Sequence, residues 1–234
     1  MNILITGASR GIGAATYQLL KSRGHTVVGH SSKGSDELVA GDLMDPAAPR
    51  KIWEAALDRL DGRIDILINN AGIFEGVAEG AFDDEWHASW NRTLRVNLES
   101  AADFCRLAVN HYRQRADGGR IVNVASRAAW RGDSPQHWHY AASKGAIVAM
   151  TKTIARAYAG EGIYAFAVSP GFTVSDMAAD YLQSRGGAGI VADIPLGRVA
   201  SADEVAETIR WLATEAPPSA TGTNVDVNGA SYVR

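Results

Sequence analysis

The sequence predicts a doubly wound α/β fold, in which a mostly parallel sheet of seven strands carries helices on both faces. Three observations lead to this fold class. Short apolar segments alternate with amphipathic segments of helical length along the chain. A glycine-rich turn at residues 6–13 joins the first apolar segment to the first amphipathic one. The composition, with 46% hydrophobic and 21% charged residues, is that of a globular protein and not of a disordered or collagen-like chain.

Strands are predicted where a short apolar run ends in a turn or a polar residue. Seven segments fit this description: residues 2–5, 25–28, 37–40, 64–68, 120–124, 164–168 and 224–227. Helices are predicted between them, at 12–23, from an Asp45-Pro46 cap to 60, from near Asp84, at 98–115, at 138–159 and at 203–214. Because helices separate most of the strands, the strands are expected to run mostly parallel.

A single domain over residues 1–234 is the simplest organisation, because no repeat, linker or low-complexity tract interrupts the chain. The segment 173–199 carries several glycines and prolines and is expected to form a mobile loop with short helices. Ligands of parallel α/β sheets bind beyond the carboxyl ends of the strands. The functional residues are therefore sought at those ends.

Charge and cysteine content restrict the partners. The chain has 23 basic and 26 acidic residues, a formal charge of -3, so no strong field draws it to nucleic acid or to an anionic membrane. No apolar stretch approaches the ~20 residues that span a bilayer, and a cytoplasmic location is expected. Cys105 is expected to be a buried apolar residue. His137 and His139 lack a third ligand at metal spacing, so no metal site is expected.

The turn at 6–13, with the sequence TGASRGIG, is predicted to bind the pyrophosphate of a dinucleotide. Its glycines permit a tight turn and a close approach of the backbone, and the next helix offers free N–H groups to an anion. A merely structural turn is the alternative.

The end of the second strand favours NADP over NAD. An acidic side chain there would bind the ribose 2′-hydroxyl of NAD, but residues 29–33 read GHSSK. Ser31 and Ser32 can donate hydrogen bonds to a 2′-phosphate, and Lys33 and Arg10 can supply positive charge. The alternative is that Lys33 is a solvated loop charge.

Two further strand ends are candidates for the nucleotide site. Asp42 could accept a hydrogen bond from the adenine amino group, or it could be a turn residue. The sequence NNAG at 69–72 fits a backbone that runs close to a ribose, with an Asx turn as the alternative.

Three residues could form the reacting group. Tyr140 and Lys144 are four residues apart and therefore share one helix face. A nearby ammonium lowers the pKa of a phenol, which permits proton transfer near neutral pH. Ser126 follows the predicted strand 120–124, so its hydroxyl could hold a carbonyl or alkoxide oxygen at the same sheet edge.

Together these motifs resemble those of the short-chain dehydrogenase/reductase family in its compact single-domain form, which has a Rossmann-type fold. The resemblance covers nearly all the chain. It is carried by TGASRGIG at 6–13, NNAG at 69–72, Asn97, Ser126, YAASK at 140–144, PG at 170–171 and TGTNVDVNG at 221–229.

The resemblance implies a role for each catalytic residue. Tyr140 would be the general acid/base, and Lys144 would lower its pKa and bind the nicotinamide ribose. Ser126 would orient the substrate oxygen, and Asn97 would hold a water that links Lys144 to solvent. The backbone from 171 to 173 would contact the nicotinamide carboxamide.

One residue of the cofactor pattern departs from the family. Ser175 stands where the family often has Thr, which keeps the hydroxyl and loses the methyl group. The predicted cofactor-binding residues are Gly7, Ser9, Arg10, Gly11, Ile12, Gly13, Ser31, Ser32, Lys33, Asp42, Leu43, Asn70, Ala71, Gly72, Tyr140, Lys144, Pro170, Gly171, Thr173 and Ser175.

The resemblance also implies a substrate lid and an assembly. The segment 184–198 resembles the family's lid, and the predicted helices 98–115 and 138–159 would form the faces of a homotetramer, with a homodimer as the alternative. The loop before the catalytic helix could be a pocket wall or a subunit contact. Its aromatic and basic residues are Trp130, Arg131, His137, Trp138 and His139. Arg127 and Arg131 could attract an acidic substrate or face solvent.

The predicted function is an NADP(H)-dependent oxidoreductase that interconverts a ketone and a secondary alcohol, similar to the 3-oxoacyl thioester reductases. NAD is the less favoured cofactor. A non-catalytic nucleotide-binding scaffold or sensor is the first alternative, and it would bind cofactor tightly without reducing any ketone. An epimerase or dehydratase is the second, although such enzymes usually need a larger substrate domain.

Overall fold

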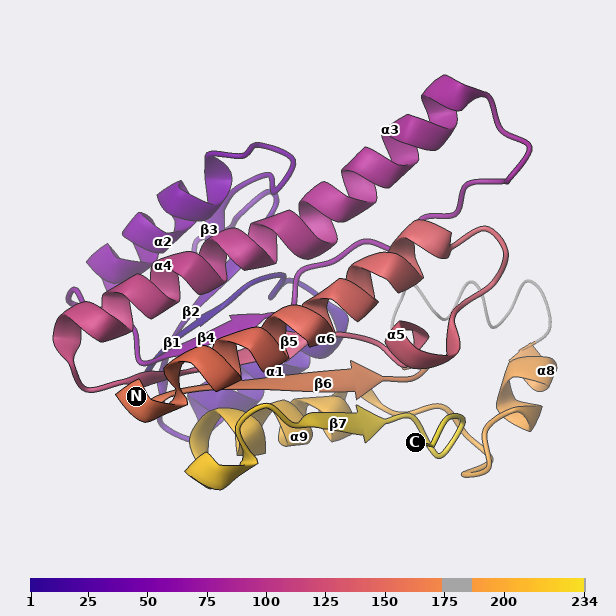
Figure 1. Ribbon diagram of the computed structural model, residues 1–234. Coiled ribbons are helices and arrows are strands. Elements are labelled where there is room, and N and C mark those ends of the chain that lie inside the picture. The colour runs from indigo at the N-terminus through magenta and orange to yellow at the C-terminus, as the bar shows by residue number, and fades with distance from the viewer. Residues whose placement is uncertain (174–186, 234) are drawn as a thin grey trace.

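The computed structural model describes residues 1–173 and 187–233. Its centre is a sheet of seven strands in the order β3-β2-β1-β4-β5-β6-β7, in which every neighbouring pair is parallel (Figure 1). The strands are β1 (Asn2–Ile5), β2 (Thr26–Ser31), β3 (Leu38–Ala40), β4 (Ile66–Asn69), β5 (Gly119–Val124), β6 (Ile163–Pro170) and β7 (Asn224–Val227). The predicted fold class is confirmed. The strand order reverses between β1 and β4, which is where such sheets bind their ligands.

Helices cover both faces of the sheet (Figure 1). They are α1 (Gly11–Ser22), α2 (Ala48–Arg59), α3 (Asp83–Leu94), α4 (Ser100–Arg115), α5 (Ala128–Arg131), α6 (Trp138–Tyr158), α8 (Gly187–Ala192) and α9 (Ala202–Thr214). Short 3₁₀ turns follow at Ala159–Glu161 and Pro218–Ala220. None of the helices among the described residues is long and apolar enough to cross a membrane.

The alternation of side chains along each strand divides the core in two. Ile3 and Ile5 of β1 pack with α1 and α9 on one face, whereas Leu4 packs with α2 and α4 on the other. All three are completely buried. Both faces of the strands are therefore apolar, which explains why the strands read as continuous apolar runs in the sequence.

The structure differs from the predicted elements in the α2 region. The expected cap at Asp45-Pro46 is wrong, because α2 begins at Ala48 and its first turn contains Pro49. Asp45 instead closes the preceding turn, where its carboxylate accepts a hydrogen bond from the Ala47 N–H at 2.8 Å. Sequence patterns that signal a helix cap and a turn are alike, since both use a side-chain oxygen on a nearby N–H.

A π-helical turn, η1 (Arg95–Glu99), joins α3 to α4 into one long helix (Figure 1). The sequence analysis did not predict it. The single extra residue per turn rotates Asn97 inward, where its side chain is buried.

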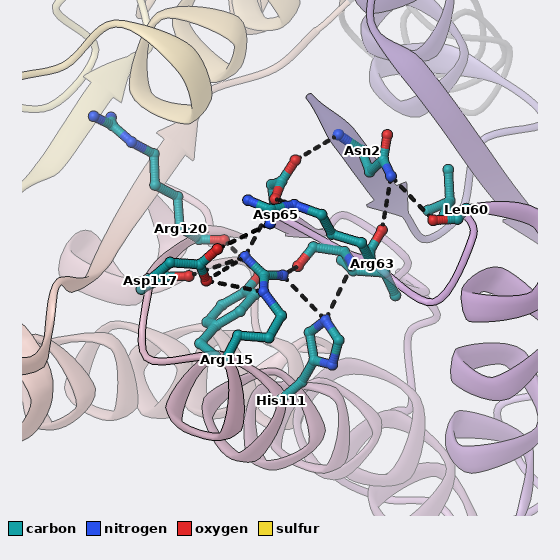
Figure 2. Close-up of polar contacts among 11 residues, drawn as sticks. Asn2, Leu60, Arg63, Asp65, His111, Arg115, Asp117 and Arg120 are labelled. Carbon is teal, nitrogen blue, oxygen red and sulfur yellow. Dashed lines mark hydrogen bonds and ion pairs between the residues drawn. The ribbon is translucent and has the colours of Figure 1, made fainter.

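Ion pairs tie the loops at the amino ends of the central strands (Figure 2). The Arg115 guanidinium lies 3.3 Å from Asp65 and 2.7 Å from Asp117, and it also donates to the Ile64 carbonyl. Burial opposes the ionisation of Asp65. Hydrogen bonds from the Asn2 N–H and from Arg63, with the neighbouring arginine charges, nevertheless hold its pKa below the ordinary value. This cluster lies at the edge opposite the carboxyl ends of the strands.

Candidate active site

A cavity of about 660 Å³ lies along the carboxyl ends of the strands. It is large enough for a nucleotide cofactor together with a small substrate. The structure brings most of the predicted site residues into its wall: Gly7, Ser9, Arg10, Gly11, Ile12, Gly13, Ser31, Ser32, Asp42, Leu43, Asn70, Ala71, Gly72, Ser126, Tyr140, Lys144, Pro170, Gly171 and Thr173.

The glycine-rich loop is held against the end of β4. The Asn70 side-chain amide donates to the carbonyls of Thr6 and Gly7, both at 3.0 Å, and the Thr6 hydroxyl accepts from the Asn70 and Ala71 N–H groups. A Cβ on Gly13 would lie only 2.0 Å from the Gly7 carbonyl oxygen. Glycine at 13 is therefore required for the loop to fold back on α1.

The N-terminus of α1 offers hydrogen-bond donors to the cavity. Its N-cap residue, Arg10, makes no side-chain cap, and the residues of the first turn line the cavity wall. The first N–H groups of a helix have no partner within the helix and carry partial positive charge. This donor set fits the pyrophosphate of a dinucleotide.

His30 is a cavity residue that the sequence analysis missed. Its Nδ1 lies 3.4 Å from the Gly7 nitrogen, which can only donate, so Nε2 carries the proton and donates to the Gly41 carbonyl at 2.9 Å. Burial lowers the pKa of His30 and favours this neutral form. The sequence feature that could have indicated this role is a polar residue one position before the end of the segment that forms β2.

The end of β2 agrees only in part with the prediction. Arg10 and Ser32 are exposed and line the cavity, and Ser31 is buried with its hydroxyl accepting from the Gly34 N–H at 3.0 Å. Lys33 is exposed and does not belong to the cavity wall. Of the two predicted cations, the structure therefore brings only Arg10 to the cavity.

Asp42 is a turn residue in the cavity wall, and its contact with an adenine amino group stays a prediction. It lines the cavity, and its carboxylate accepts a hydrogen bond from the Met44 N–H at 3.0 Å, as in a turn. One oxygen is engaged in that turn, and a carboxylate has capacity for further donors.

Ser126 and Tyr140 meet in the cavity wall. The Ser126 hydroxyl accepts a hydrogen bond from the Ala128 N–H at 3.1 Å, and it lies close enough to the Tyr140 phenol to lower the pKa of that phenol. Burial raises the pKa of Tyr140 to about 12, against the opposing effect of Ser126. The phenol is therefore protonated at neutral pH and can act as a proton donor.

The prediction that Lys144 lowers the pKa of Tyr140 is wrong for this structure. The Lys144 ammonium donates to the Val124 carbonyl at 2.9 Å and lies 5.8 Å from the centre of the Tyr140 ring. Burial lowers the pKa of Lys144 itself to about 8. The Lys144 ammonium thus donates a hydrogen bond to a main-chain oxygen instead of to the phenol.

Asn97 lies behind the cavity and not in its wall. Its amide nitrogen donates to the Ile73 carbonyl at 3.0 Å, and its oxygen accepts from the Ile73 N–H at 2.8 Å. A Cβ on Gly72 would lie 3.3 Å from this oxygen and 3.5 Å from the Lys144 nitrogen. Asn97 and Lys144 therefore approach the same point of the backbone.

The substrate end of the cavity is formed by the loops after β4 and β5. His137 stacks on Phe74 with ring centres 3.9 Å apart, and Phe74 meets Tyr140 edge-on. Trp138 is 54% exposed, and His139 is buried against Ser89. Of the aromatic and histidine residues in the loop before α6, only His137 belongs to the cavity wall.

The structure describes only part of the predicted lid, and it does not describe the last of the predicted cofactor-binding residues. Ser175 and residues 184–186 lie outside the described residues. Within the remainder of the lid, α8 is followed by Ile194, which is buried, and the Leu196 N–H donates to the Gly229 carbonyl at 3.1 Å. The described residues contain no cluster of His, Cys, Asp and Glu that could hold a metal ion.

Comparison with known proteins identifies the family. Residues 7–230 match a family model described as enoyl-(acyl carrier protein) reductase. The chain belongs to the short-chain dehydrogenase/reductase family. It is 33% identical to 3-oxoacyl-[acyl-carrier-protein] reductase of Escherichia coli over 242 residues, which cover 98% of this chain and 96% of the relative. The corresponding reductase of Synechocystis is 34% identical over 244 residues, 97% of this chain and 94% of the relative.

This short-chain dehydrogenase/reductase is an NADP(H)-dependent oxidoreductase that interconverts a ketone and a secondary alcohol. The residues of the cavity fit that cofactor, because Arg10 offers a positive charge and Ser32 a hydroxyl that suit a 2′-phosphate. Neither the family nor the relatives favours the non-catalytic alternative.

Proposed function

We propose that this enzyme reduces the ketone of a 3-oxoacyl compound to the 3-hydroxy compound with NADPH, and that Tyr140 donates the proton. The proximity of Ser126 and Tyr140 carries the proposal, because both residues lie in the same cavity as the glycine-rich loop. The similarity to 3-oxoacyl-[acyl-carrier-protein] reductases supports the substrate class.

The proposed reaction begins with the ketone oxygen held by two hydroxyl groups. The Ser126 hydroxyl and the Tyr140 phenol donate hydrogen bonds to this oxygen and stabilise the negative charge that develops on it. The bound NADPH supplies the hydride that adds to the carbonyl carbon. Tyr140 then passes its proton to the alkoxide oxygen, so that the ketone gains a hydride and a proton.

Lys144 and Asn97 are proposed to complete the proton path. Lys144 would bind the nicotinamide ribose, and its pKa of about 8 allows it to exchange a proton near neutral pH. Asn97 would hold a water that links Lys144 to solvent. Its position beside Gly72, close to the Lys144 nitrogen, supports this role.

Replacement of the phenol tests the proposal. We expect Tyr140→Phe to lower turnover at least about 10³-fold, because general acid catalysis contributes on the order of 10² to 10⁴-fold. NADPH affinity should change less than about fivefold, since one hydrogen bond contributes about 1 kcal/mol. Turnover is followed by the absorbance of the reduced nicotinamide with 3-oxoacyl esters as substrates, and affinity is measured by calorimetry.

Tyr158→Phe is the matched control. Tyr158 ends the same helix, packs on the core beside Arg113 and is not part of the cavity wall. Its loss should leave turnover unchanged. Turnover of Tyr140→Phe within threefold of the wild type would remove Tyr140 from the proton transfer.

We also propose that one domain carries both cofactor and substrate. We further propose that the chain assembles as a homotetramer or a homodimer through α4 and α6. Both helices pack on the same side of the sheet, and Ala101, Ile147 and Val148 form an apolar cluster between them. Sedimentation of the protein at several concentrations distinguishes these assemblies from a monomer.

A further inference from the structure

Arg127 is a half-buried cation at the substrate end of the cavity. It directly follows Ser126, and its N–H donates to the Pro170 carbonyl at 2.9 Å, which fixes its backbone between β5 and β6. Both Ser126 and Arg127 belong to the cavity wall. Among residues 1–173 and 187–233, no carboxylate forms an ion pair with the Arg127 guanidinium.

Most of the hydrogen-bond donors of Arg127 are available. A guanidinium has five N–H donors, and one of them donates to the Ser231 hydroxyl at 2.6 Å. The charged group also lies 4.7 Å from the centre of the Phe172 ring, which lines the same cavity. Among residues 1–173 and 187–233, the direct contacts that the structure shows for this guanidinium are a neutral oxygen and an aromatic face, which compensate a partly desolvated cation poorly.

The other charges near the substrate end do not compensate it. Arg92 lines the cavity but is paired with Glu75 at 3.0 Å. Asp133 also lines the cavity, yet it is exposed, so water screens its charge. Arg131 pairs with Asp193 at 3.8 Å. Apart from Lys144, whose ammonium donates to the Val124 carbonyl beside Tyr140, the least compensated charge at this end among residues 1–173 and 187–233 is therefore the positive charge of Arg127.

We propose that Arg127 binds a carboxylate of the substrate and that the enzyme prefers a free 3-oxo acid to its neutral esters. This inference rests on the proposed function, since Ser126 must hold the ketone oxygen. Both residues line the same cavity, so a short 3-oxo acid can present its ketone to Ser126 and its carboxylate to Arg127. The planar fork of a guanidinium matches a carboxylate in two parallel hydrogen bonds.

Matched pairs of acid and ester test the inference. The probes are 3-oxobutanoate and 3-oxohexanoate, each compared with its methyl ester, and the readout is the ratio of kcat/KM for acid to that for ester. We expect the wild type to favour the acid by about 10- to 100-fold, the range of a charge-assisted hydrogen-bonded pair. Arg127→Met should abolish this preference by lowering kcat/KM for the acid toward the value for the ester.

Two further variants serve as controls. Arg127→Lys should retain part of the preference, because it keeps the charge and loses the planar fork. Arg131→Met should leave the ratio unchanged, since Arg131 lies one turn away on α5 and is not part of the cavity wall. A wild-type ratio near one, or an unchanged ratio in Arg127→Met, would overturn the inference and leave ketone reduction intact. Absence of turnover with both acid and ester would instead contradict the proposed function.

A measurement on the wild type keeps the inference testable if Arg127→Met does not fold. Succinate and its dimethyl ester are compared as competitive inhibitors of ester reduction. We expect succinate to bind at least tenfold more tightly, and equal inhibition by the two compounds would overturn the inference.

Discussion

Adding a single methyl group at Gly13 should disable the nucleotide loop. Gly13 lies in the first turn of α1, and its Cβ in an alanine variant would be 2.0 Å from the Gly7 carbonyl oxygen and 2.4 Å from the Asn70 side-chain nitrogen. Contacts this short do not persist, so the loop must move away from the helix. The movement breaks the two hydrogen bonds that Asn70 donates to Thr6 and Gly7.

The magnitude follows from these contacts. Overpacking costs about 1–3 kcal/mol, and each lost hydrogen bond costs about 1 kcal/mol. Alanine is otherwise the better helix former by about 1 kcal/mol, so without the clash the variant would be more stable than the wild type. We expect Gly13→Ala to lower the free energy of unfolding by about 2–4 kcal/mol and NADPH affinity by at least about 30-fold, because 2 kcal/mol corresponds to that factor.

Calorimetric titration with NADPH and thermal unfolding measure the two effects. Gly145→Ala is the control, because Gly145 also lies within a helix and its nearest neighbour, the Ala129 carbonyl oxygen, would be 3.8 Å from the new Cβ. That variant should be as stable as the wild type or more so and should bind NADPH normally. An equally stable Gly13→Ala with unchanged affinity would refute the requirement for glycine in this turn.

Three other perturbations have expected outcomes. Arg10→Gln should weaken NADPH binding about tenfold and NADH binding little, whereas Lys33→Gln should change neither, as titration with both cofactors will show. Arg115→Met should lower the free energy of unfolding by about 2 kcal/mol without changing the turnover of the folded enzyme, since it removes two ion pairs far from the cavity. A normal denaturation midpoint would contradict this. His30 is held neutral by burial, with its pKa lowered, so NADPH affinity should be constant above about pH 6.5 and fall as the pH decreases and the ring gains a proton. His30→Gln should lose this acid dependence, and an acid dependence equal to that of the wild type would exclude His30 as its origin.

The sheet and the strand-end residues could be predicted from sequence because both depend on local patterns. A buried parallel strand is a short apolar run, and the reacting and nucleotide residues follow such runs directly, as Ser126 follows β5 and Asn70 follows β4. Once the strands are parallel, their carboxyl ends share one edge, so no further information is needed to bring these residues together. The pairing register of neighbouring strands only refines the distances between these residues.

Features that depend on contacts between distant segments could not be predicted. The inward position of Asn97 depends on a π-helical turn, whose extra residue has no sequence signature in RVNLE. Lys33 is the next residue after Ser32 beyond the end of β2, yet of these two only Ser32 lines the cavity. His30 looks like an ordinary strand residue until the loops that hold Gly7 and Gly41 are placed on either side of its ring.

The separation of Tyr140 and Lys144 along the sequence predicts only part of their geometry. A separation of four residues places Tyr140 and Lys144 on one helix face, but it does not determine which oxygen the ammonium binds. That choice is made by β5, whose last carbonyl, at Val124, lies within hydrogen-bond distance of the buried amine. A main-chain carbonyl carries no proton and cannot lose its acceptor capacity as the pH changes, whereas a neutral phenol accepts weakly. The phenol therefore keeps its proton, and Tyr140 begins the reductive reaction in the form that it needs as an acid.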